Sequence, residues 1–476
     1  MTEWWRKTAG DIAEAIRTKQ VSAEEVMESH IARTDQVNAK LNAITVRLDD
    51  EARALARAAD QAVAKGGKLG PLHGVPVTIK ENVDQKGFAT TNGVEAFADM
   101  VAPDDAPVVA NLRKAGAIPF GRTNTPEFSL RYFTDNVLRG QTFNPWNREV
   151  TPGGSSGGAG AAVASGMGSI GHGNDLGGSV RYPAYACGIV GIRPTLGRVP
   201  AFNPTQTEER PPTIQLMSVQ GPHCRTVADT RLALAAMAGR DPRDPWWVPA
   251  PLESAAPHTP PRAAICPDPG GIGVDKTVAD AVRRAGDALA SAGYEVAEID
   301  TPRIMEAAEL WMSLIMAEIK VLMEPAIRKY GSHKINRVLD LYYEGLPAFY
   351  GNRKPSDDLE TYMRGIAARA GLVRDWTSFL EDHGVLVGPV SAEPPFKVGD
   401  DEISGARSAE IWRANRLTVA MNLMGLPSVA VPTEPVGGVP RGVQIVAQRY
   451  REDMALDAAQ AVEDACGVAT PIDPAW

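Results

Sequence analysis

Two glycine-serine turns lie close together in residues 151–181, and they constrain the fold more than any other stretch of the chain. The turns occupy residues 153–158 and 177–179, and a run rich in Ala, Gly and Val begins directly after the first turn. Because glycine has no Cβ, backbone N–H groups in such turns can point into a cleft and approach a ligand closely. The run between the turns predicts a short, tightly packed helix or buried segment. Serines from two different turns could then meet in one cleft.

A lysine closes an apolar, β-branched run upstream of these turns. Residues 75–79 predict a buried strand, and Lys80 follows directly. Burying a charged lysine is unfavourable, and desolvation lowers its pKa toward neutrality. The sequence therefore predicts a neutral lysine that can act as a base.

Together the three elements resemble the amidase signature family, whose members are Ser-cisSer-Lys amide hydrolases. Lys80 matches the family's lysine, Ser155 the serine that follows a cis peptide bond, and Ser179 the acylated nucleophile. The spacing between the two serines also agrees with the family. Further stretches similar to the family lie at residues 71–74, 121–124, 221–222, 225–229, 422–427 and 442–445.

The resemblance implies an α/β fold in which a large mixed β-sheet is covered by helices on both faces. Hydrophobic spacing agrees, because helical and strand-like periods alternate along the chain. Helices are predicted at residues 8–19, from Ser22 onward, 48–65, 229–238, 278–292 and 304–327, with a break at Pro325. Strands are predicted at residues 41–46, 75–79, 118–120, 262–267 and 296–299.

We expect one amidase domain over residues 1–476. Within it we distinguish an N-terminal helical segment (1–65), a catalytic core (70–230) and a variable substrate-pocket region (240–415). Residues 125–140, 202–216 and 304–350 are expected to line or cover the pockets. Their aromatic and methionine side chains could form an apolar cavity or belong to the core: Trp311, Met316, Tyr342, Tyr343, Phe349 and Tyr350.

By the same resemblance, the chain hydrolyses the C–N bond of a small or medium carboxylic amide through an acyl-enzyme. Ser179 would attack the carbonyl, and its proton would pass through Ser155 to neutral Lys80. Backbone N–H groups would hold the oxyanion, those of Leu176, Gly177, Gly178 and Ser179.

Two charged residues of the same loop are candidates for supporting roles. Asp175 is expected to orient the loop or Lys80, and Arg181 to hold the loop by hydrogen bonds. A purely structural role stays open for both. His73 and His172 are expected near the cleft as structural histidines.

Several alternatives remain open for the function. Within the family these are an aryl carbamate, anilide or ester hydrolase, and the glutaminase subunit of a tRNA-dependent amidotransferase. Residues 125–130 depart from the stretch expected in that glutaminase. A non-catalytic binding protein is the alternative from another class, and the presence of Lys80, Ser155 and Ser179 argues against it.

Composition and sequence patterns limit which partners the protein can bind and where in the cell we expect it. A formal net charge of −9 argues against a nucleic-acid partner. No apolar stretch reaches spanning length, so we expect no membrane partner and a cytoplasmic location. The dispersed histidines and cysteines predict no metal site and four free thiols. We expect no cofactor, because Ser179, Ser155, Lys80 and the backbone donors already cover the catalytic tasks. A homodimer is left open.

Overall fold

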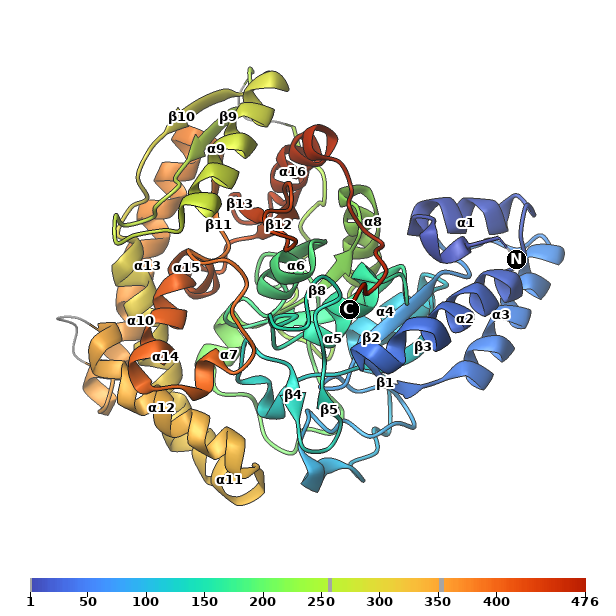
Figure 1. Ribbon diagram of the computed structural model, residues 1–476, viewed down its shortest axis with the longest axis horizontal. Helices are drawn as coiled ribbons and strands as arrows, with labels where there is room; N and C mark the ends of the chain where they lie inside the picture. The colour runs from blue at the N-terminus through green and yellow to red at the C-terminus, as the bar shows by residue number, and fades with distance from the viewer. Residues whose placement is uncertain (1, 256–258, 351–354) are drawn as a thin grey trace.

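One large mixed β-sheet runs through the computed structural model, which describes residues 2–255, 259–350 and 355–476 (Figure 1). Eleven strands of these described residues form it, in the order β1-β3-β2-β6-β8-β7-β12-β13-β11-β9-β10. Their bounds are β1 (Ile44–Arg47), β2 (Pro76–Lys80), β3 (Ile118–Thr123), β6 (Ile170–Asp175), β7 (Val190–Arg193), β8 (Val219–Cys224), β9 (Arg262–Ile265), β10 (Glu295–Glu298), β11 (Val385–Pro389), β12 (Ser428–Pro432) and β13 (Gly442–Val446). A separate hairpin pairs β4 (Asp135–Asn136) with β5 (Gly140–Gln141).

Helices cover both faces of this sheet, as the sequence predicted (Figure 1). The α-helices of the first half are α1 (Ala9–Arg17), α2 (Ala23–Leu41), α3 (Asp49–Ala64), α4 (Pro107–Lys114), α5 (Gly157–Ala164), α6 (Arg181–Cys187), α7 (Pro212–Met217) and α8 (Val227–Met237). Those of the second half are α9 (Lys276–Ser291), α10 (Ile304–Glu318), α11 (Glu324–Tyr330), α12 (His333–Tyr350), α13 (Leu359–His383), α14 (Gly405–Ala414), α15 (Arg416–Met424) and α16 (Glu452–Cys466). Short helical turns lie at Trp4–Arg6, Glu95–Phe97, Glu127–Ser129, Ile319–Met323 and Asp400–Glu402.

The local sequence signals explain where several helices begin and end. Ser22 and Glu25 form the predicted capping box of α2. The small-residue run is α5, an eight-residue helix whose side chains are all buried. The long apolar helix predicted from residue 304 is interrupted by a π-helical turn, and Pro325 lies in the first turn of α11. There its missing N–H costs no helical hydrogen bond.

The hydrophobic side chains form two clusters. The larger cluster packs against the sheet and includes residues of α2, α8, α9 and α16. The smaller one joins α10, α12, α13 and α15, and in Figure 1 these helices lie on the side of the molecule away from the N-terminal helices α1 to α3. Side chains of this second cluster form one wall of the cavity described below.

Parallel pairing of β2 with β6 positions the candidate catalytic residues. β2 lies between β3 and β6 and runs parallel to both. Because the carboxyl ends of parallel strands meet at one edge of a sheet, the ends of β2 and β6 lie together, and ligand sites commonly form at such edges. Lys80 ends β2 and Asp175 ends β6.

Two further sequence expectations concern the whole chain. Within the described ranges, no helix is both long and apolar enough to cross a membrane. The four cysteines are free thiols, and three of them are buried.

The close packing of α5 generates a prediction about stability. A Cβ on Gly158 would lie 2.4 Å from the backbone nitrogen of Asn124 and 2.8 Å from the carbonyl oxygen of Ala43, two atoms that hydrogen-bond each other. Gly158→Ala should therefore lower the free energy of unfolding by about 1–3 kcal/mol, measured by denaturant titration. Gly67→Ala is the control, because its Cβ would meet no atom closer than 4.0 Å. Equal midpoints for the two variants would contradict this packing.

Candidate active site

Lys80 lies at the carboxyl end of β2 and has no exposed surface. Its Nζ is hydrogen-bonded to Ser155 Oγ and to Asn174 Oδ1, each at 2.7 Å. Burial lowers the pKa of Lys80 well below its usual value of 10.5, and the negative charge of Asp175 opposes this shift only in part. The structure thus brings the predicted base and the predicted bridging serine into contact.

Ser155 lies in the turn before α5, and the peptide bond between Gly154 and Ser155 is cis. The Ser155 side chain is buried, and its hydroxyl faces Lys80. A Cβ on Gly154 would lie 2.3 Å from the carbonyl oxygen of Arg131 and 2.7 Å from the backbone nitrogen of Phe133. This close backbone approach requires glycine before the serine.

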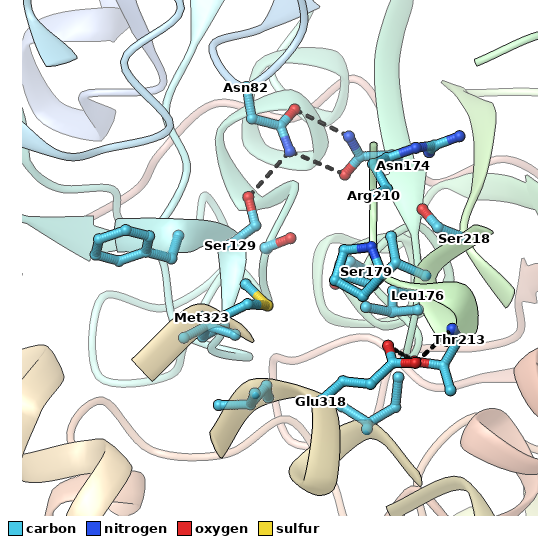
Figure 2. Close-up of a pocket in the computed structure, with 18 of the residues that line it drawn as sticks. Asn82, Ser129, Asn174, Leu176, Ser179, Arg210, Thr213, Ser218, Glu318 and Met323 are labelled. Atoms are coloured by element: carbon cyan, nitrogen blue, oxygen red, sulfur yellow. Dashed lines mark hydrogen bonds between the residues drawn. The ribbon is translucent and has the colours of Figure 1, made fainter. Parts of the chain in front are cut away.

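Ser179 lies between β6 and α6 and borders a cavity of about 430 Å³ that Ser155 also borders (Figure 2). The Ser179 hydroxyl makes no hydrogen bond with any residue that the structure describes. Both serines therefore reach one cleft, as the sequence indicated. The hydrogen bond between them that the proton relay requires stays a prediction.

Asp175 holds the loop that carries Ser179. Its carboxylate accepts hydrogen bonds from the backbone N–H groups of Gly178 at 2.8 Å and Val180 at 3.1 Å. It also pairs with Arg181, whose Nη2 donates to Oδ1 at 3.0 Å, and both side chains are fully buried. Burial opposes ionisation of Asp175, but the charge and hydrogen bonds of Arg181 outweigh it and hold the pKa of this carboxyl well below its usual range.

Arg181 connects the same loop to the C-terminal part of the chain. It donates to the carbonyl oxygen of Thr418, to Asn422 Oδ1 on α15 and to Gln444 Oε1 on β13, at 2.9, 2.6 and 3.0 Å. Asn422 in turn donates to Asp175 Oδ1 at 2.8 Å. Residues 422–427 and 442–445 resemble the family in sequence, but the sequence predicts no role for them. In the structure, Asn422 and Gln444 of these segments anchor the loop through Arg181.

The backbone donors near Ser179 are not all free. The Gly178 N–H donates to Asp175, so its assignment to the oxyanion site conflicts with this hydrogen bond. The N–H groups of Leu176, Gly177 and Ser179 donate to no described residue. The carbonyl oxygens of Leu176 and Gly177 accept hydrogen bonds from Trp311 and Tyr132, which fixes the loop from the cavity side. Three backbone amides of this loop can therefore serve as oxyanion donors.

Sequence reasoning missed an amide pair beside Lys80. Asn174 Nδ2 donates to Asn82 Oδ1 at 2.9 Å, and Asn82 Nδ2 donates to Asn174 Oδ1 at 3.2 Å and to Ser129 Oγ at 3.0 Å (Figure 2). Asn82 stands two residues after Lys80, and Asn174 stands next to Asp175. With β2 and β6 known to be parallel neighbours, this spacing would have indicated the contact.

The cavity has an apolar wall and a polar wall. Residues of all three segments predicted to line it do so: 125–140, 202–216 and 304–350. Its apolar wall includes Phe128, Leu176, Trp311, Met312, Ile315, Met316, Met323, Tyr342 and Trp412. Its polar wall includes Asn82, Ser129, Asn174, Asn203, Ser218 and Gln220. Charged residues border the cavity as well: Arg131, Glu208, Glu209, Arg210 and Glu318.

Other candidate lining residues lie elsewhere. Phe349 and Tyr350 are buried in the second hydrophobic cluster, and Tyr343 donates a hydrogen bond to Glu324. His73 Nε2 lies 3.0 Å from the carbonyl oxygen of Ala59, and His172 Nε2 lies 2.8 Å from Gln220 Oε1. Both contacts are those of structural histidines, as predicted.

The buried Asp175–Arg181 pair predicts a strongly non-additive double-mutant cycle. Arg181→Met leaves a buried carboxylate without its cation, and Asp175→Asn leaves a buried guanidinium without its anion. Each single change should lower the free energy of unfolding by about 3–5 kcal/mol, and the double variant should recover part of that loss. Denaturant titration measures the cycle, with the exposed Lys276→Met as a neutral control. Additive losses would contradict the coupling.

Comparison with known proteins places the chain in a family. A family model described as Amidase matches residues 25–456. An indoleacetamide hydrolase of Bradyrhizobium diazoefficiens is 49% identical over 465 residues, which cover 98% of this chain and 87% of that protein. A glutamyl-tRNA(Gln) amidotransferase subunit of Moorella thermoacetica is 30% identical over 494 residues, covering 97% of each.

A solved structure agrees with these sequence matches. The crystal structure of a bacterial aryl acylamidase of the amidase signature family superposes with a TM-score of 0.81 at 26% identity, over 98% of this chain and 96% of that one. Both sequence and fold therefore lead to the same conclusion: the chain belongs to the amidase signature family and is an amide-cleaving hydrolase.

Proposed function

We propose that the protein hydrolyses the primary amide of an arylacetamide, such as indole-3-acetamide, to the arylacetate and ammonia. The observation that carries this proposal is the position of Ser179 in a cavity with one aromatic wall and one amide-and-hydroxyl wall. The 49% identity to an indoleacetamide hydrolase supports the same substrate class.

The aromatic wall suits the aryl group of such a substrate. Trp412 lies 5.4 Å from Trp311, 5.5 Å from Tyr342 and 5.1 Å from Tyr132 between ring centroids, in tilted or edge-on arrangements. Edge-on and offset geometries are favourable for aromatic pairs, and methionines adapt to irregular ring shapes. A bicyclic ring can pack against this wall while its acetamide carbonyl reaches Ser179.

The polar wall suits the small leaving group. Asn82, Ser129 and Asn174 lie on the side of the cavity next to Lys80. An amide nitrogen that departs as ammonia needs hydrogen-bonding partners and little space. A large apolar amine would instead desolvate these side chains without pairing them, which is unfavourable.

The proposed chemistry uses the three residues inferred from the sequence. Ser179 Oγ attacks the amide carbon while its proton passes to Ser155 and the proton of Ser155 passes to neutral Lys80. The free N–H groups of Leu176, Gly177 and Ser179 stabilise the oxyanion. Lys80 then returns a proton through Ser155 to the leaving nitrogen, the C–N bond breaks, and water hydrolyses the acyl-enzyme by the same path.

The glutaminase alternative has weaker support from the relatives, because the identity to the amidotransferase subunit is 30% and that to the indoleacetamide hydrolase is 49%. Glutamine carries a charged carboxylate, which needs a cation in the site. Two arginines border the cavity: Arg131 is paired with Asp401, Asp135 and Glu402, and Arg210 donates a hydrogen bond to the carbonyl oxygen of Ala201.

A possible homodimer and a cytoplasmic location stay predictions from the sequence.

The substrate proposal predicts a clear order in a turnover panel. The kcat/KM for indole-3-acetamide should exceed that for propionamide by roughly 10- to 150-fold, because burying an aromatic ring contributes about 1.5–3 kcal/mol. Ammonia release is measured for both, and for glutamine and an indoleacetyl anilide. Trp412→Ala should weaken turnover of indole-3-acetamide and leave that of propionamide nearly unchanged. Preference for glutamine or for the anilide would contradict the proposal.

The lysine base predicts the direction of the pH dependence. Lys80 acts when deprotonated, so kcat/KM should be high above its pKa and fall as the pH drops through it. Because burial lowers the pKa of Lys80, this acid limb should lie well below pH 10.5. Activity is measured over about pH 5–10 with chemistry shown to be rate-limiting. A flat profile under that condition would contradict the relay.

A further inference from the structure

We propose that Asn174 is a positioning residue for the catalytic lysine: its side-chain oxygen holds one N–H of Lys80, so that the lone pair of the neutral amine faces Ser155. The proposal rests on the Lys80–Ser155–Ser179 relay argued above. Asn174 Oδ1 and Ser155 Oγ are the two atoms to which Lys80 Nζ hydrogen-bonds among the described residues, each at 2.7 Å.

The direction of these two hydrogen bonds follows from what each atom can do. A neutral amine carries two N–H groups and one lone pair. A carboxamide oxygen accepts only, so an N–H of Lys80 must point at Asn174. A serine hydroxyl can both donate and accept, so Ser155 can offer its proton to the lone pair. Without the acceptor, the amine could rotate its lone pair away from Ser155.

Asn174 can fix the amine because Asn174 is itself fixed. Its NH₂ group donates to Asn82 Oδ1, and its oxygen accepts from Asn82 Nδ2 as well as from Lys80. Asn82 also donates to Ser129 Oγ, which donates to Asn92 Oδ1 at 2.7 Å. Figure 2 shows Asn82, Asn174 and Ser129 joined on one side of the cavity. The amide orientation of Asn174 is therefore determined by two partners.

The proton movements balance with Asn174 unchanged throughout. As Ser179 Oγ bonds to the amide carbon, its proton moves to Ser155 and the Ser155 proton moves to Lys80, which becomes an ammonium. Asn174 accepts from an N–H before and after this step. When the C–N bond breaks, the proton returns along the same path to the leaving nitrogen. Asn174 exchanges no proton in any of these steps, so its role toward Lys80 is positional.

The other ionisable groups around Lys80 do not by themselves determine its protonation state, so Asn174 can still change the pKa of Lys80. Asp175 on β6 favours the ammonium form. His172 on β6 and His223 on β8 are buried, which lowers their pKa values to about 3 and about 4 and keeps them uncharged. Arg122 on β3 is buried and donates to the carbonyl oxygens of Ala89 and Val83, and His30 on α2 is buried with a pKa lowered to about 4.

Two substitutions of Asn174 test the proposal by moving the acid limb of kcat/KM in opposite directions. Asn174→Asp places a carboxylate against Lys80 and favours the ammonium, so the limb should move to higher pH by about one unit or more. Asn174→Leu removes the acceptor, so the limb should move to lower pH while the plateau of kcat/KM falls. The control Gln206→Glu adds the same charge at the cavity without touching Lys80, and its limb should stay in place.

The outcomes distinguish this proposal from the relay on which it rests. If the wild-type protein shows no acid limb, the relay itself is wrong. If the wild-type limb is present but Asn174→Asp and Asn174→Leu only lower the plateau, Asn174 is merely structural and the proposal is overturned. Should one variant fail to fold by circular dichroism, the other decides. Asn82→Asp, one hydrogen bond further away, should shift the limb in the same direction as Asn174→Asp but by less.

Discussion

A lysine without exposed surface is the constraint on which this active site depends. Burying a charged amine in this part of the molecule would be costly, so Lys80 favours its neutral form and needs polar partners for its N–H groups and lone pair. The parallel pairing of β2 and β6 supplies Asn174 as one partner, and the turn before α5 supplies Ser155 as the other. A lysine base whose pKa is lowered by burial thus follows from the pairing of these strands.

A second buried charge, the carboxylate of Asp175, holds the loop that carries Ser179, and Arg181 pairs with this carboxylate. Asp175 fixes the backbone after β6, and Arg181 links Asp175 to α15 and β13. Segments more than two hundred residues apart in the sequence therefore determine where Ser179 lies. A change in α15 can disturb the nucleophile without touching the cavity.

The sequence predicted the elements whose chemistry is local and missed those that depend on neighbouring strands. Ser155 and Ser179 stand in recognisable glycine turns, Lys80 closes a recognisable apolar run, and α5 follows from a run of small residues. The contact between Lys80 and Asn174 depends on β2 and β6 being parallel neighbours, which no local pattern contains. The resemblance to the family assigned the Gly178 N–H to the oxyanion site; here the carboxylate of Asp175, three residues earlier, accepts it. Trp412 could not be singled out, because its contacts with Trp311 and Tyr342 are tertiary.

The central claim is that an acyl group forms on Ser179 and on no other serine. Rapid quenching during turnover of indole-3-acetamide, followed by mass spectrometry of the peptides, tests it most directly. We expect an indoleacetyl group on the peptide that contains Ser179, and its loss in Ser179→Ala. An acyl group on Ser155 or Ser156, or full turnover by Ser179→Ala, would contradict it.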